Sequence, residues 1–178
     1  MKNFMGINSL NNLGKATHKA VSMVNYNFLT IWKFSAPLDK VYDVIRDADK
    51  YHLWWKGQSP VQTISNGNGY GVGTVKRFRT RSILPYSLVY DGIVLDVLPL
   101  KRIEGKTIGD LKGHGIWEFD CKSGATIASY YWNVKTDVHW MNALAPFLKP
   151  VFEWNHDVVM RWGAEGLARY LGCELIRD

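Results

Sequence analysis

Five consecutive segments between residues 74 and 136 are rich in β-branched and aromatic residues and are joined by short turns. They are TVKRFRTR (74–81), YSLVYDGIVLDVLP (86–99), KRIEGKTIG (101–109), LKGHGIWEFD (111–120) and ATIASYYWNVKT (125–136). Such segments are typical of strands, and Gly, Pro or Asp at the joints favours tight turns between antiparallel neighbours. The run therefore predicts an antiparallel meander.

The segments on either side complete the expected fold. YNFLTIWKF (26–34) reads as a strand, two short helices are expected before about residue 55, and VQTI (61–64) is a short strand. Residues 141–171 read as one long helix. This order predicts an α+β helix-grip fold, in which a curved antiparallel sheet of six to seven strands surrounds the C-terminal helix.

The length of 178 residues fits one domain, which we place at residues 24–174. Residues 1–23 are expected to form an N-terminal arm or short helix, and Met23 is a candidate alternative start. The first residues lack the apolar core of a secretory signal, and no run of about 18 apolar residues suggests a membrane span. Cys121 and Cys173 form no close motif, which favours a reduced, cytoplasmic setting.

The net charge of +6 favours an acidic partner: an anionic lipid surface, a carboxylate ligand or nucleic acid. Alternation along residues 74–81 puts Arg77, Arg79 and Arg81 on one face and Phe78 on the other. An apolar interior favours Phe78 inside, with the arginines pointing away from it. No nucleic-acid motif accompanies them, so we expect no nucleic-acid partner, and peripheral contact with an anionic membrane surface remains open.

Recognisable catalytic and metal motifs are missing from the sequence. The loop NGNGYGVG lacks the spacing of a phosphate-binding loop, although it could gate a pocket. No Gly-x-Ser-x-Gly or His-Glu-x-x-His occurs, and the five histidines are scattered. We therefore expect no metal site and no cofactor, and the sequence assigns no catalytic residue.

The C-terminal helix combines an apolar stripe with features that a solid core would disfavour. The stripe consists of Leu144, Leu148, Val151, Asn155, Val158 and Trp162. Asn155 interrupts it and His156 flanks it, so these polar groups need hydrogen bonds, either from a structural partner or from a ligand. Pro146 and Pro150 each remove a backbone hydrogen bond at about 3 kcal/mol in a helix interior, which predicts a bend that leaves an opening against the sheet.

Aromatic residues beside glycines support a hollow interior. Alternation directs two sets inward: Ala128, Tyr130, Trp132 and Val134 from one strand, and Leu111, Gly113, Gly115, Trp117 and Phe119 from another. We expect a cavity of about 300 Å³ or more between helix and sheet. Its candidate walls are Trp32, Phe78, Tyr90, Trp117, Tyr130, Trp132 and Phe152, with Asn155 and His156 as polar contacts.

Three stretches of the sequence resemble a known superfamily. They are APLDKVYDVI, LPYSL and GDLKGHGIWEFD followed by YYWNVKTDVHWMNALAPFLKPVFEWNHDVVMRWGAEGLARYL. Across residues 24–172 the chain resembles the START-like helix-grip (SRPBCC) superfamily, in its branch named for polyketide cyclase/dehydrase and lipid transport. The resemblance implies a seven-stranded sheet enclosing an apolar cavity. Superfamily members bind lipids, sterols, quinones, plant hormones or polyketides, and some are enzymes.

Three functions remain open at this point. The first is binding or carriage of an apolar small molecule, such as a lipid, a quinone or a polyketide-like compound. The second is a polyketide cyclase or aromatase that uses the same cavity, with Tyr90, Tyr130 or His156 moving a proton. The third is a partner-binding module that uses the basic face or the N-terminal arm.

Overall fold

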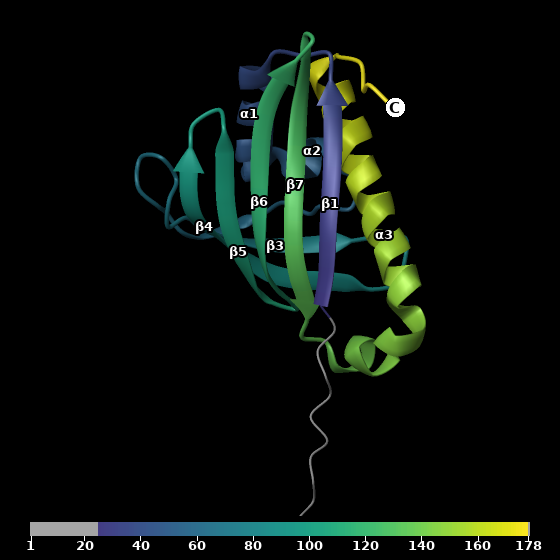
Figure 1. The fold of residues 1–178 in the computed structure, drawn as a ribbon. Helices are drawn as coiled ribbons and strands as arrows, with labels where there is room; N and C mark the ends of the chain where they lie inside the picture. Colours follow the sequence, from purple (N-terminus) through teal and green to yellow (C-terminus); the bar gives the residue numbers. More distant parts are fainter. Residues whose placement is uncertain (1–24, 178) are drawn as a thin grey trace, which may run out of the picture.

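A seven-stranded antiparallel sheet curves around the long C-terminal helix (Figure 1). The computed structural model describes residues 25–177, apart from the side chains of residues 142, 143, 145, 146 and 148. The predicted arm at residues 1–23, with Met23 as a start, lies outside the described residues. The elements are β1 (Asn25–Phe34), α1 (Leu38–Arg46), η1 (Ala48–Lys50), α2 (Tyr51–Trp54), β2 (Gln62–Ser65), β3 (Val75–Arg81), β4 (Ser87–Leu98), β5 (Arg102–Gly109), β6 (Leu111–Lys122), β7 (Ala125–Thr136) and α3 (His139–Leu171).

The strand order is β1-β7-β6-β5-β4-β3-β2, so the chain runs as a meander from β2 to β7 and β1 closes the far edge. Every strand pair is antiparallel, which confirms the predicted α+β helix-grip fold. Because short turns join the strands from β3 to β7, each strand pairs with the one before it in the chain, and the strand order follows the sequence.

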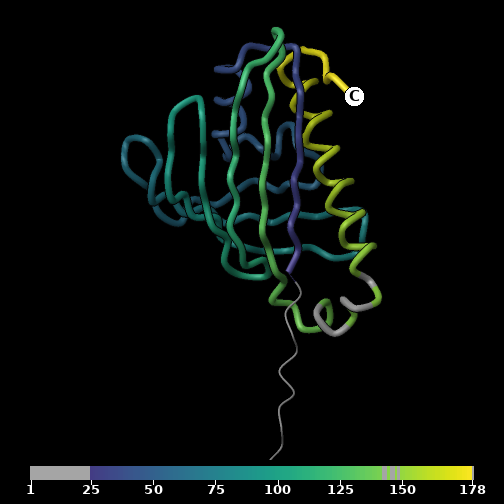
Figure 2. The backbone as a smooth tube through the Cα atoms, in the orientation of Figure 1, coloured from purple at the N-terminus to yellow at the C-terminus, as the bar shows by residue number. Residues whose placement is uncertain are grey.

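The sheet curves strongly enough for its far end to reach the helix. Figure 2 shows the β3–β4 end passing behind β6, β7 and β1 towards α3. The aromatic rings of Tyr86, just before β4, and Trp140, in the first turn of α3, meet edge to face at 5.5 Å. An irregularity in β4 between Val94 and Asp96 adds to the curvature, since a bulge bends and twists its strand.

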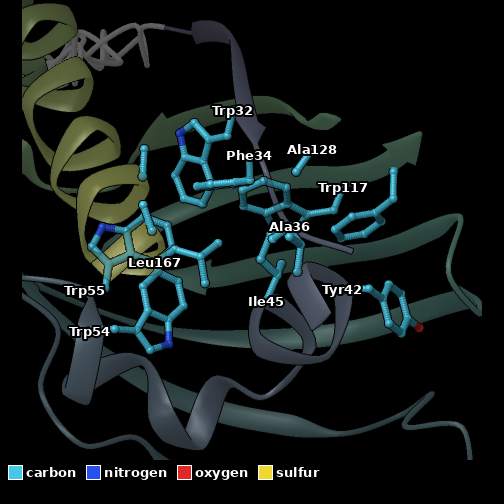
Figure 3. Packing of buried hydrophobic residues seen from close by; sticks show 14 of the residues in the cluster. Trp32, Phe34, Ala36, Tyr42, Ile45, Trp54, Trp55, Trp117, Ala128 and Leu167 are labelled. Carbon is cyan, nitrogen blue, oxygen red and sulfur yellow. The ribbon is translucent and has the colours of Figure 1, made fainter. Parts of the chain in front are cut away.

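The C-terminal half of α3 packs tightly against α2 and the sheet. A Cβ at Gly166 would lie 1.8 Å from the Trp54 carbonyl oxygen, and one at Gly163 would lie 2.6 Å from the Trp55 ring. Leu167 is fully buried in the same cluster (Figure 3). The two glycines therefore let helix backbone and indole rings meet at a distance that no other residue would permit.

The N-terminal half of α3 is arranged differently. Its first turns lie at a steep angle to the rest of the helix (Figure 1), and this half contains both prolines. The predicted apolar stripe is wrong here, because Leu144 is 44% exposed and Val151 is 37% exposed. Among the described side chains of this half, Met141, Phe152 and Asn155 are buried.

Candidate functional site

A cavity of about 460 Å³ lies between the concave face of the sheet and the part of α3 from Met141 to Met160. Its walls come from α3, from α2, from the end of α1 and from every strand except β2. The volume exceeds the expected lower limit of about 300 Å³ and falls within the range of small-molecule sites. Beyond Met160, the helix and the sheet are in contact through a tightly packed cluster of buried residues around Leu167.

Eight of the nine predicted wall and contact residues line this cavity. They are Phe78, Tyr90, Trp117, Tyr130, Trp132, Phe152, Asn155 and His156. They come from β3, β4, β6, β7 and α3, so the curvature of the sheet brings together residues that are up to 78 positions apart. Their contact with a ligand stays a prediction.

Trp32 does not line the cavity, which corrects its predicted place in the wall. It is 3% exposed and packs in the closed cluster against Trp55 at 5.4 Å and Trp117 at 5.1 Å between ring centroids. Two residues that sequence reasoning missed, Tyr26 and Phe28, supply the β1 part of the wall. They share the inward face of β1 with Trp32 by alternation, but they lie nearer the open half of α3.

Stacked aromatic rings form the flat walls of the cavity. Trp117 and Tyr130 stack at 4.5 Å between ring centroids, and Phe78 and Tyr90 stack at 5.4 Å. Gly115 makes room for Tyr130, because a Cβ at this glycine would lie 2.5 Å from the tyrosine oxygen. The predicted pairing of glycines with inward aromatic residues on β6 and β7 is therefore present in the structure.

A polar network lies between α2, β3 and β4 on the cavity wall. The Tyr51 hydroxyl donates to the Ile45 carbonyl oxygen at 2.5 Å. The Thr80 hydroxyl donates to Gln58 Oε1 at 3.0 Å and lies 3.3 Å from the Tyr90 hydroxyl. Burial raises the pKa of Tyr51 and of Tyr90 above the ordinary value, so both hydroxyls are neutral at physiological pH.

Asn155, His156 and Trp132 form a second polar region. Asn155 Oδ1, His156 Nε2 and Trp132 Nε1 are buried and have no hydrogen-bond partner within residues 25–177. His156 stacks on Phe28 at 3.7 Å between ring centroids. Burial lowers the pKa of His156, although Asp157, 3.5 Å from Nδ1, acts in the opposite direction. The imidazole is therefore neutral near pH 7, and Nε2 can accept a proton or a hydrogen bond.

The glycine-rich loop between β2 and β3 borders one end of the cavity through Tyr70 and Gly71. Tyr70 is 66% exposed, so the cavity approaches the surface there. Lys76 also lines this end and pairs with Asp49 at 2.5 Å. A loop in this position is suited to control access, as the sequence suggested, while phosphate binding has no motif to support it.

The three arginines of β3 point away from the cavity, as predicted. Arg77, Arg79 and Arg81 are exposed, whereas Phe78 between them lines the cavity. Arg77 forms two hydrogen bonds to the Asp91 carboxylate, at 2.7 and 2.9 Å. The basic stripe is therefore an outer surface and contributes no charge to the interior.

Within residues 25–177, no three His, Cys, Asp or Glu side chains gather closely enough to hold a metal ion. Over the same range, no helix has both the length and the apolar character needed to cross a membrane. Cys121 is exposed and Cys173 is partly buried, and neither lines the cavity. Besides neutral hydroxyl, amide, indole and imidazole groups, the cavity wall includes the charged residues Arg46, Lys76, Glu104 and Lys106.

Comparison with family models gives no match, and comparison with curated proteins gives none either. Solved structures do match. A START superfamily protein from Mycobacterium smegmatis has a TM-score of 0.66 and 13% identity over 82% of this chain and 97% of its own. The Zhui aromatase/cyclase from Streptomyces sp. R1128 has a TM-score of 0.65 and 15% identity over 82% and 95%.

A third similar structure, that of Ara h 8.0201, has a TM-score of 0.61 and 13% identity over 83% of this chain and 98% of its own. Identities this low establish a shared fold and carry no ligand or reaction from one protein to another. The curved seven-stranded sheet, the enclosed C-terminal helix and these neighbours together show that the chain has the START-like helix-grip fold.

Proposed function

We propose that this protein binds and carries an apolar small molecule, of lipid, quinone or polyketide type, in the cavity beneath α3. The observation that carries the proposal is the cavity itself, about 460 Å³ with stacked aromatic walls. Ligand sites of this kind are mostly apolar, with a few polar groups that orient the ligand. The aromatic rings favour a flat or ring-containing ligand, because flat faces stack at low conformational cost.

The test combines extraction with a binding assay. Purified protein is extracted with organic solvent and the extract is analysed by mass spectrometry, while the emptied protein is titrated with the apolar dye N-phenyl-1-naphthylamine. We expect the dye to bind the wild type, and Trp132→Ala to weaken binding about tenfold through loss of an aromatic wall. Trp154→Ala is the matched control, because Trp154 is 50% exposed on α3. A wild type that binds no dye and yields no extracted ligand would refute the proposal.

A cyclase or aromatase that uses the same cavity is the second candidate. It is supported by the neutral His156, whose Nε2 has no partner among the described residues, and by structural neighbours that include aromatase/cyclases. Such a reaction needs a positioned base, and a neutral imidazole beside the cavity could act as one. Incubation with a linear poly-β-ketone and detection of a cyclised product would support this function, and its absence despite binding would favour the carrier.

Contact of the basic face with an anionic membrane surface is a further proposal. Arg79 and Arg81 are exposed on the outer face of β3, and each basic residue near such a surface contributes about 1 kcal/mol. Sedimentation with vesicles containing phosphatidylserine tests it: binding should fall for the Arg79→Gln/Arg81→Gln variant and with added salt. Binding that depends on neither would contradict an electrostatic contact.

A further inference from the structure

Three tyrosine side chains from distant elements converge on one region of the cavity. Tyr51 from α2, Tyr90 from β4 and Tyr130 from β7 all line it, and we call them the tyrosine group. The Phe78 ring stacks on Tyr90 at 5.4 Å and lies 6.3 Å from Tyr51. The Tyr130 hydroxyl lies over Gly115 of β6, and only β5 separates β6 from β4, the strand that carries Tyr90.

Two of the three hydroxyl protons already have acceptors. Tyr51 donates its proton to the Ile45 carbonyl oxygen. Thr80 donates its proton to Gln58 Oε1, so in its contact with Tyr90 the threonine oxygen accepts and the tyrosine donates. Tyr51 and Tyr90 therefore have no proton left to give, but each phenol oxygen retains capacity to accept a hydrogen bond.

Tyr130 differs from Tyr51 and Tyr90 because its hydroxyl proton is still available for a hydrogen bond. Its hydroxyl makes no hydrogen bond within residues 25–177, and its ring stacks on Trp117 and lies over Gly115. Burial raises its pKa, so the hydroxyl keeps its proton. The tyrosine group thus presents one uncommitted donor beside two acceptors.

We propose that the tyrosine group receives a hydroxyl group of the ligand, so that the cavity selects an apolar molecule carrying an alcohol or a phenol. The ligand oxygen accepts a hydrogen bond from the Tyr130 hydroxyl, and the ligand hydroxyl donates a hydrogen bond to the oxygen of Tyr90 or Tyr51. This inference rests on the proposed function, since it requires that the cavity takes up an apolar ligand.

Other polar groups match this arrangement less well. A hydrocarbon leaves the Tyr130 hydroxyl unpaired, and an ether or ketone accepts a hydrogen bond without returning one to the two acceptors. A carboxylate also returns no hydrogen bond to the two acceptor oxygens, and its loss of hydration on burial is costly. Of the basic residues on the cavity wall, Lys76 is already paired with Asp49.

Four ligands with the same ring system test the inference by titration calorimetry on the emptied full-length protein. They are 2-naphthol, 2-methoxynaphthalene, naphthalene and 2-naphthoate. We expect 2-naphthol to bind about tenfold more tightly than naphthalene, because each added hydrogen bond contributes several-fold in affinity. The methoxy compound should fall between them, and the carboxylate should bind most weakly.

Tyr130→Phe removes the donor and keeps the ring, so it should lower the affinity for 2-naphthol to about that for naphthalene. Tyr131→Phe is the matched control, because Tyr131 is the next residue of β7, on the opposite face, and is 43% exposed. Equal affinities for 2-naphthol and naphthalene, a preference that survives Tyr130→Phe, or tightest binding of 2-naphthoate would each overturn the inference while leaving the carrier function intact. No binding of any of the four, nor of the dye, would instead refute the proposed function.

Discussion

Replacing Asn155 with leucine should make the protein more stable, even though the change removes a side chain from the candidate site. Asn155 is 8% exposed in the buried face of α3, and its Oδ1 atom has no hydrogen-bond partner among the described residues. A buried polar atom without a partner costs about 1–3 kcal/mol, and leucine has a similar size without that atom. The free energy of unfolding should therefore rise by about 1–2 kcal/mol.

Thermal denaturation followed by circular dichroism measures this effect. For a chain of this length, 1 kcal/mol shifts the Tm by about 2–4 °C, so Asn155→Leu should raise the Tm by about 2–8 °C. Asn133→Leu is the matched control, since Asn133 is exposed on β7, where it bonds to Asn27, and its replacement should change stability by less than about 0.5 kcal/mol. A loss of more than 1 kcal/mol in Asn155→Leu would refute the reasoning, because it would mean that the amide is satisfied in the native protein.

Two more predictions concern α3. Gly166→Ala should lower the free energy of unfolding by about 1–3 kcal/mol in urea denaturation, because the new Cβ meets the Trp54 carbonyl oxygen. Gly69→Ala is the control and should be neutral, since a Cβ there meets nothing within 4 Å. Equal effects of the two substitutions would contradict the tight packing of α3. Burial lowers the pKa of His156 in the folded state, so below the ordinary value of 6.5 the unfolded chain binds more protons. Stability should therefore be constant above about pH 6.5 and should fall as the pH decreases below it, and this fall should be smaller in His156→Leu; an equal fall in both proteins would contradict the assignment.

The element order could be predicted from the sequence because its signals are local. Alternation identifies each strand, short turns fix antiparallel neighbours, and the long segment of helical period identifies α3. The same alternation correctly directed Phe78 into the cavity and the arginines on either side outward. Local patterns determine which face of a strand is buried, and for the meander that was enough to place all five of its predicted residues on the cavity wall.

What sequence reasoning placed wrongly depends on position along an element. Alternation puts Phe28 and Trp32 on the same face of β1, but it does not say which of them meets the closed half of α3 and which meets the cavity. The exposure of Leu144 and Val151 has a similar cause, because a helix that bends presents different faces before and after the bend. The tyrosine group was missed as a unit, since about 40 residues separate each of its members in the chain.

The two halves of α3 have different surroundings: the C-terminal half is tightly packed, and the N-terminal half borders the cavity. In the C-terminal half, Gly163 and Gly166 bring the helix into direct contact with Trp54 and Trp55, so this half resembles an ordinary protein core. In the N-terminal half, a cavity lies between sheet and helix, and buried polar atoms such as Asn155 Oδ1 remain without partners in the described chain. Trp55 and Trp117 belong both to the packed cluster and to the cavity wall, so their substitution should change stability as well as binding, whereas wall residues outside this cluster, such as Trp132, can be varied with less effect on it. A ligand that fills the cavity adds contacts to the looser half, and the resulting stabilisation grows with ligand concentration by mass action.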